Sequence, residues 1–301
     1  MARPGHRESY PGVFPTLQAV SIRLLILLAV LAAALFLLVR SFGRIVDGVL
    51  FQPSPGIDLT PERLGLVAEE VSLLTEDGVR IHAFWLPSPG AGRAVLFLHG
   101  NAGNASHRLP NAAELQALGT DVLLVDYRGY GRSEGHPSEA GVYADARAGL
   151  VHLLEERGLP EERIIVFGRS LGGAVAVDLA QGRPLAGLIL ESTWSTLSAV
   201  ARPLFFGVFA RAVDGRFDSA DKITRSRAPL LFFHGDRDNI IDTSTGDHSN
   251  TFADCGSCSG VVDWGDCGEL RSDASGGREG DQYEPSVFHL WSPLDLSKLH
   301  L

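Results

Sequence analysis

The chain has 301 residues, of which 45% are hydrophobic and 21% are charged, and its formal net charge is −10. This length fits one compact domain with additional ends, and the apolar content excludes a wholly disordered chain. The acidic balance argues against a nucleic-acid-binding protein, which needs a clustered basic face. The sequence also lacks the G-x-x-x-x-G-K-[ST] motif, so phosphate-loop nucleotide chemistry is not expected.

The first predicted element is a transmembrane anchor over residues 20–42, after an N-terminal tail of residues 1–19. Its centre is an unbroken apolar run, residues 24–39, flanked by Arg23 and Arg40. Sixteen helical residues span only about 24 Å of a bilayer core of about 30 Å, and the adjoining residues close that gap. A cleaved signal peptide and a buried core helix are the alternatives. The few arginines on either side do not define the orientation in the membrane.

An α/β domain is predicted over residues 45–242, beginning with a proline-rich linker at 52–63. Short apolar runs alternate with helical patterns, which is typical of a mostly parallel sheet covered by helices on both faces. The predicted strands are 70–74, 79–86, 94–98, 122–126, 164–167, 188–191 and 230–233, and the predicted helices are 106–118, 139–157 and 171–180. The apolar stretch 203–209 fits either core packing or a small cap over an acyl pocket.

Two G-x-S-x-G motifs are candidates for a serine nucleophile. Acyl transfer needs a serine on a tight turn between a strand and a helix, followed by a backbone N–H that can stabilise an oxyanion. The motif around Ser133 follows a glycine-rich loop, whereas the motif around Ser170 directly follows the predicted strand 164–167 and precedes the predicted helix 171–180. Ser170 is therefore the predicted nucleophile, and Ser133 is predicted to be a loop residue.

The strand at 94–98 ends in the sequence HGNAGN, a loop that in such sheets supplies an oxyanion N–H. The predicted donors are the backbone amides of Asn101 and Leu171. His99 could be taken for a general base, but at the end of this strand it is expected to shape the loop instead. Asp126, at the end of the predicted strand 122–126, and Arg128 are expected to brace the loops beside the site.

Four segments in order carry a family resemblance. They read LFLHGNAGNASHRLP at 96–110, VDYRGYGRSEGHPSEA at 125–140, VFGRSLGGAVAVDLAQ at 166–181 and LFFHGDRDN at 231–239. They resemble the α/β-hydrolase-fold serine hydrolases, above all the membrane-anchored α/β-hydrolase domain-containing protein 13 type and its bacterial relatives. The resemblance covers residues 45–242. It implies an N-terminal anchor and a Ser-Asp-His triad acting on an ester or thioester, with Asp238 as the acid that orients the histidine. It implies no metal or organic cofactor.

The catalytic histidine of that family has no clear counterpart. The family continues with a helix, a last strand and a glycine-rich loop that carries the histidine. Residues 261–268 could supply the last strand and loop, but Glu269 stands where the histidine is due. His248 follows Asp238 too closely, and His289 and His300 lack a glycine-rich setting. The base is therefore unassigned.

An abrupt change of composition follows Ile241. Residues 243–301 hold ten acidic and three basic residues and all three cysteines, Cys255, Cys258 and Cys267. Three thiols without a well-spaced fourth ligand do not make a zinc site. The change indicates a frameshift or misjoined gene model beginning near Asp242, a divergent C-terminus with a relocated base, or a non-catalytic homologue.

The sequence thus predicts a membrane-anchored serine hydrolase acting on a small-molecule or lipid-like acyl substrate. The alternative is a catalytically inactive binding or scaffold protein with the same fold, or a frameshifted product without its histidine. The oligomeric state and the side of the membrane are not defined by the sequence.

Overall fold

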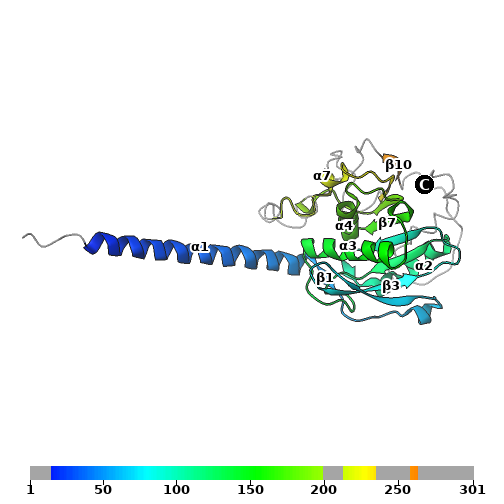
Figure 1. The fold of residues 1–301 in the computed structure, drawn as a ribbon, viewed down its shortest axis with the longest axis horizontal. Coiled ribbons are helices and arrows are strands. Elements are labelled where there is room, and N and C mark those ends of the chain that lie inside the picture. The colour runs from blue at the N-terminus through cyan, green and yellow to red at the C-terminus, as the bar shows by residue number, and fades with distance from the viewer. Residues whose placement is uncertain (1–14, 199–212, 235–257, 264–301) are drawn as a thin grey trace, which may run out of the picture. The chain divides into compact units, whose positions relative to one another are not determined.

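The computed structural model describes residues 15–198, 213–234 and 258–263 (Figure 1). The chain divides into two compact units, Met1–Leu50 and Phe51–Leu301. The predicted cap stretch 203–209 and most of the tail lie outside the described residues.

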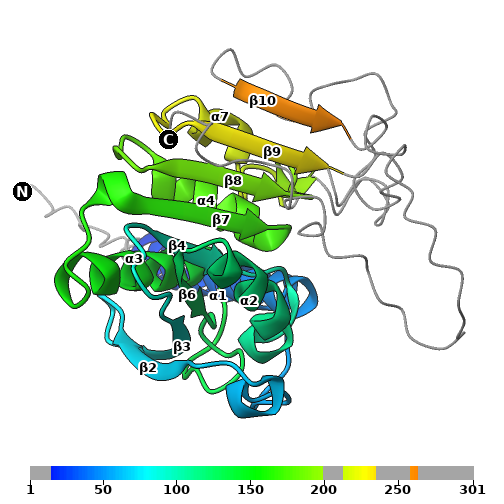
Figure 2. The ribbon, with the colours of Figure 1, turned by 90° about the vertical axis from the view of Figure 1, so that its right-hand side faces the viewer.

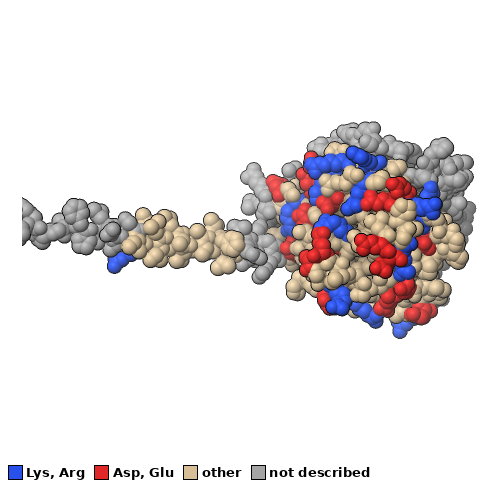
Figure 3. Space-filling view, in the orientation of Figure 1, with Lys and Arg blue, Asp and Glu red and all other residues tan. Residues whose placement is uncertain are grey.

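The first unit contains one helix, α1 (Pro15–Leu50), which is longer than the predicted segment 20–42. Its described side chains from Ile22 to Leu38 are exposed, and the large apolar ones show 53% or more of their surface. In Figure 3 this part of the helix carries a charged side chain only near its N-terminal end. Over the part of the chain that the structure describes, no helix combines the length and apolarity needed to cross a membrane. The anchor stays a prediction.

The second unit is built on an eight-stranded sheet with the order β10-β9-β8-β7-β4-β6-β3-β2. Strand β3 runs antiparallel to β2 and β6, and the other neighbours are parallel. Figure 2 shows β10, β9, β8 and β7 side by side and pointing the same way. The strands are β2 (Glu69–Leu74), β3 (Arg80–Leu86), β4 (Ala94–Leu98), β6 (Asp121–Val125), β7 (Ile164–Arg169), β8 (Gly187–Glu191), β9 (Leu230–His234) and β10 (Cys258–Asp263).

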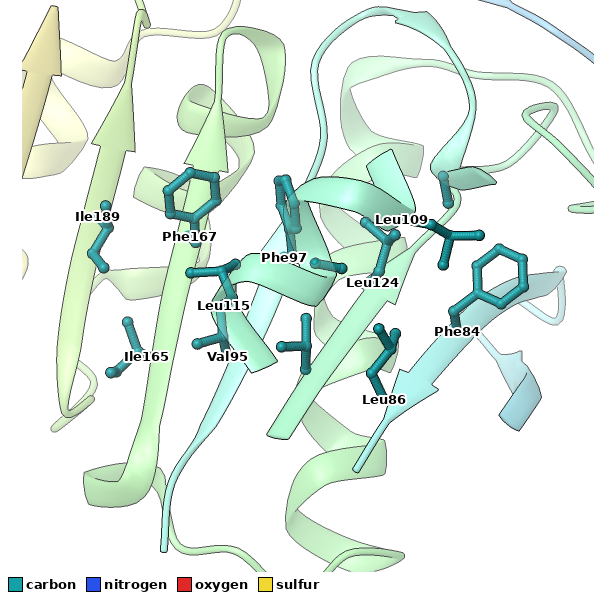
Figure 4. Close-up of a cluster of buried hydrophobic side chains, with 13 residues drawn as sticks. Phe84, Leu86, Val95, Phe97, Leu109, Leu115, Leu124, Ile165, Phe167 and Ile189 are labelled. Carbon is teal, nitrogen blue, oxygen red and sulfur yellow. The ribbon is translucent and has the colours of Figure 1, made fainter. Parts of the chain in front are cut away.

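Helices cover both faces of this sheet. Alternate residues of β4 and β7, among them Val95 and Phe167, pack in one apolar cluster with α2 (Leu109–Ala117). Figure 4 shows side chains of this cluster from several strands gathered with those of α2. The intervening strand residues face α3 (Glu139–Glu155) and α4 (Leu171–Ala180), which lie against the opposite face. The sheet is therefore buried on both sides, as the continuous apolar strands predicted.

The segment predicted as a linker is folded against the domain. Strand β1 (Gln52–Pro53) pairs in parallel with β5 (Ala102–Gly103), and Pro55 forms a bridge with Gly131. Further along, η1 (Pro61–Leu64) makes a 3-10 turn. The prolines do not prevent this pairing, because Ser54 supplies the backbone N–H that donates to Gly103 (2.9 Å). This segment thus fixes the loop that follows β4.

The predicted helix 106–118 begins instead as a 3-10 turn, η2 (Ala105–Arg108), before α2. Pro110 explains the difference, because it has no N–H to donate to the carbonyl of Ser106 in a regular helix. It lies in the first turn of α2, where proline is tolerated. The short helix α7 (Ser219–Ile223) and the short strands β1 and β5 were not predicted from the sequence.

On the visible face of the second unit, acidic and basic side chains are interspersed and neither sign forms a continuous patch (Figure 3).

Candidate active site

Ser170 occupies the turn between β7 and α4 in a strained backbone conformation. Its φ is 53° and its ψ is −116°, a region that non-glycine residues rarely adopt. Its N–H donates to the Glu191 carbonyl (2.8 Å), and its own carbonyl accepts from the Thr193 hydroxyl (2.8 Å) and from the Gly173 N–H (2.9 Å). The surrounding chain therefore holds the strained turn in place. Such a turn is the hallmark of a nucleophile elbow.

The glycines around Ser170 are imposed by close packing. A Cβ on Gly168 would overlap the Gly172 carbonyl, and a Cβ on Gly172 would overlap the Leu98 carbonyl at the end of β4. A Cβ on Gly173 would overlap the Thr193 side chain. The glycines of the sequence G-R-S-L-G-G thus allow α4 to pack closely against β4, β7 and the loop after β8.

The loop after β4 lies directly beside Ser170. A Cβ built on Gly100 would be 3.4 Å from the Cβ of Ser170. Asn101 follows Gly100, and its side-chain oxygen accepts from the Tyr130 hydroxyl (2.9 Å) and from the Gln52 N–H (3.1 Å). Leu171 is the first residue of α4. The fold thus brings the segments that carry Ser170, Leu171 and Asn101 together.

His99 is fully buried beneath this loop. Its Nδ1 lies 2.7 Å from the Gly100 carbonyl oxygen, and its own carbonyl accepts from the Tyr127 hydroxyl (3.0 Å). Its ring packs against those of Tyr127 and Tyr130, with centroids 4.7 and 5.4 Å away. These contacts agree with the predicted role of His99 in shaping the loop.

Ser133 lies in the loop after β6, as predicted. Its hydroxyl donates to the Asp126 carbonyl (2.9 Å) and accepts from the His82 N–H (2.8 Å). These contacts tie the loop to the end of β6 and to β3, so this second G-x-S-x-G motif is structural.

Asp126 is a completely buried carboxylate at the end of β6. Burial by itself raises its pKa, but the side chains of His82 and His99 and the Ala105 N–H, all pointing at the carboxylate, hold the pKa below its ordinary value. The Ala105 N–H donates to Oδ1 (2.7 Å), and His82 Nδ1 lies 3.4 Å from Oδ2. The contact with His82 was missed from the sequence, because it joins strands far apart in the chain.

Other predicted groups lie outside the described residues: Asp238, the three histidines His248, His289 and His300, and two of the three cysteines. Among the described residues, no side chain hydrogen-bonds to the Ser170 hydroxyl. Within the same part of the chain, no group of three or more His, Cys, Asp or Glu side chains is placed to hold a metal ion.

Comparison with known proteins places this architecture in a family. Residues 90–214 match the family described as serine aminopeptidase, S33. The α/β-hydrolase domain-containing protein WAV2 of Arabidopsis thaliana is 36% identical over 207 residues, which cover 62% of this chain and 67% of that protein. Protein bem46 of Schizosaccharomyces pombe is 35% identical, over 60% of this chain and 64% of its own length. The chain belongs to the α/β-hydrolase family.

Solved structures agree with this assignment. An α/β hydrolase from Vibrio vulnificus is 30% identical with a TM-score of 0.51, over 56% of this chain and 64% of that one. The esterase Pf2001 of Pyrococcus furiosus is 25% identical with a TM-score of 0.53, over 64% of this chain and 80% of the esterase. The predicted α/β-hydrolase fold is confirmed, and these matches support a hydrolase.

Proposed function

We propose that this protein is a membrane-anchored serine hydrolase that cleaves an ester or thioester through an acyl-enzyme on Ser170. The observation that carries the proposal is the strained turn at Ser170, held by hydrogen bonds to Glu191 and Thr193. A non-glycine residue in this conformation costs about 1–3 kcal/mol, and such strain concentrates at functional sites. A purely structural turn at the same place could use glycine and avoid that cost.

The reaction that fits this turn begins when the Ser170 Oγ attacks an acyl carbonyl carbon. The proton of the hydroxyl passes to a general base and then to the departing alcohol or thiol, as the bond to the leaving group breaks. Water then attacks the acyl-enzyme and releases the acid. The backbone amides of Asn101 and Leu171 are the proposed donors to the oxyanion, since Gly100 and the start of α4 both adjoin Ser170.

The base in this proposal is a histidine oriented by Asp238, as the family resemblance implies. The loss of a triad member in such enzymes leaves roughly 10³–10⁴-fold catalysis over water from the remaining parts of the site. A weak residual activity would therefore accompany an absent base. The substrate class is a small-molecule or lipid-like acyl compound, in keeping with the esterase among the similar structures.

Membrane attachment is the second part of the proposal. It is supported by the apolar run at 24–39 and by the exposed apolar side chains of α1, which need a cover in water. The proposed localisation is the membrane, through a single-pass N-terminal anchor.

A single labelling experiment tests both parts. The full chain is expressed, cells are separated into membrane and soluble fractions, and each fraction is treated with a fluorophosphonate probe. We expect labelled protein in the membrane fraction and complete loss of label in Ser170→Ala. Ser133→Ala is the matched control, because it alters the other G-x-S-x-G motif, and it should keep the label.

The outcomes separate the alternatives. A folded protein without label would mean a binding or scaffold protein, or a chain that lacks its base. Label that survives in Ser170→Ala would assign the nucleophile elsewhere. Label confined to the soluble fraction would refute the anchor while leaving the hydrolase intact.

A further inference from the structure

The loop that follows β4 approaches one buried carboxylate, that of Asp126, at both of its ends. At the far end, the Ala105 N–H donates to Asp126 Oδ1 (2.7 Å). At the near end, His99 Nε2 lies 3.5 Å from the same Oδ1. Residues 99–105, which we name the β4 loop, therefore form an arch that Asp126 contacts at both ends, through a hydrogen bond at Ala105 and a longer 3.5 Å approach at His99.

The beginning of this arch adjoins the candidate nucleophile. Gly100 lies beside Ser170, and the His99 ring reaches the Gly100 carbonyl oxygen through Nδ1 (2.7 Å). The His99 side chain thus contacts Asp126 through one ring nitrogen and, through the other, the peptide group that joins Gly100 to Asn101. The carboxylate is therefore linked to that peptide through the His99 ring.

Asp126 is itself fixed from the side away from Ser170. His82 Nδ1 lies 3.4 Å from Oδ2, and His82 Nε2 lies 3.3 Å from Glu70 Oε2 on the edge strand β2. The polar groups follow the sheet order from β2 through β3 and β6 to β4, so they form a continuous row along one edge of the sheet. The Gly131 backbone lies close to this carboxylate as well, since a Cβ on Gly131 would overlap Oδ2.

We infer that Asp126 is a positioning residue for the oxyanion donor: it sets the β4 loop so that the Asn101 amide faces the acyl oxygen on Ser170. This inference rests on the proposed function. The burial of an ionised carboxylate is costly unless several donors compensate it. A loop that needed only mechanical support could be held by apolar packing, without this cost.

The test compares the full-length protein with Asp126→Asn and Asp126→Ala. Asparagine keeps one oxygen for the Ala105 N–H but loses the charge, and alanine loses both. Hydrogen exchange is followed in peptides that contain Ala105, and kcat and KM are measured with a short-chain p-nitrophenyl ester. A hydrogen bond to a charged group corresponds to a factor of roughly 10–100. We expect the exchange of the Ala105 N–H to become faster and kcat to fall, each by that factor, while KM changes little. The larger effect is expected in Asp126→Ala.

Asp145→Asn is the matched control. Asp145 is equally buried and also accepts a backbone N–H, that of Arg128 (2.8 Å), but it makes no contact with the β4 loop in the described structure. It should leave exchange at Ala105 and kcat unchanged. If Asp126→Ala does not fold, Asp126→Asn carries the test by itself.

Three results would overturn the inference: unchanged exchange at Ala105, faster exchange with unchanged kcat, or a rise in KM at constant kcat, which would indicate substrate binding instead. Failure of the proposed function has a separate signature, because wild-type protein would then show no Ser170-dependent reactivity. Faster exchange in that case would leave Asp126 a structural brace and refute its positioning role.

Discussion

Replacing Gly172 by alanine should destabilise the protein, although alanine is the better helix former. Gly172 is the second residue of α4. Its missing side chain is what lets the helix begin directly against the end of β4, since a Cβ would overlap the Leu98 carbonyl oxygen and lie 2.7 Å from that of His99. Both obstacles are backbone atoms, one in the central strand β4 and the other directly after it, so they cannot rotate away as a side chain could.

The magnitude follows from two opposing terms. Alanine in place of glycine in a helix interior stabilises by about 0.8–1 kcal/mol. Overpacking against a rigid wall typically costs about 1–3 kcal/mol and occasionally more, and a clash with backbone belongs at the upper end. A net loss of about 2 kcal/mol or more is expected. For a domain of this size it corresponds to a fall in Tm of about 4–8 °C.

Circular dichroism melts of Gly172→Ala and Gly187→Ala at one heating rate measure the effect. Gly187 is buried in β8, but the nearest atom to its added Cβ is 3.8 Å away, so Gly187→Ala should change Tm little. A Gly172→Ala protein as stable as wild type would refute the packing argument. Equal losses in both variants would mean that the cost comes from buried glycines in general.

Two further predictions concern the buried carboxylates. Burial raises the pKa of Asp145 from its ordinary 3.8 to about 6, so the folded protein binds this proton more tightly than the unfolded chain does and loses stability as pH rises from about 4 to about 6. Relative to Asp145→Asn, the wild-type free energy of unfolding should therefore fall by up to about 3 kcal/mol across that window in urea titrations, and a pH-independent difference would contradict this. Gly131→Ala, which drives a methyl group into Asp126 at a φ of 52°, should lower the urea midpoint by an equivalent of about 1–3 kcal/mol, and an unchanged midpoint would show that the carboxylate is free to move.

The sequence is most informative where one local pattern decides the structure. Strand β4 (Ala94–Leu98) and helix α4 (Leu171–Ala180) have the predicted bounds. The short apolar run defines both ends of the strand, and the turn flanked by glycines defines where the helix begins. The turn at Ser170 was predictable for the same reason, since its strain is encoded within five residues. Pro110 was an available signal against a regular helix at 106–118, and its missing N–H accounts for the 3-10 start.

Contacts between distant segments were not accessible in this way. The segment at 52–63 looks like a linker because of its prolines, and only the tertiary structure shows that β1 has β5 as its partner. The row of side chains Glu70, His82 and Asp126 spans β2, β3 and the end of β6, and no spacing in the sequence predicts it. Sequence reasoning placed Asp126 near the loops, but the fact that it contacts both ends of one loop depends on the sheet order.

The direction of the strands decides where a base for Ser170 can come from. Ser170 follows β7 at the carboxyl end of the sheet, and β8, β9 and β10 run parallel to β7. The chain therefore leaves β9 after His234 and β10 after Asp263 at the same edge as Ser170, because carboxyl ends of parallel strands meet there. Asp238 follows the first of these exits and Glu269 the second. A base that follows either strand would therefore start from the edge of the sheet that carries Ser170, and the labelling experiment reports whether such a base acts, which separates an active hydrolase from an inactive one.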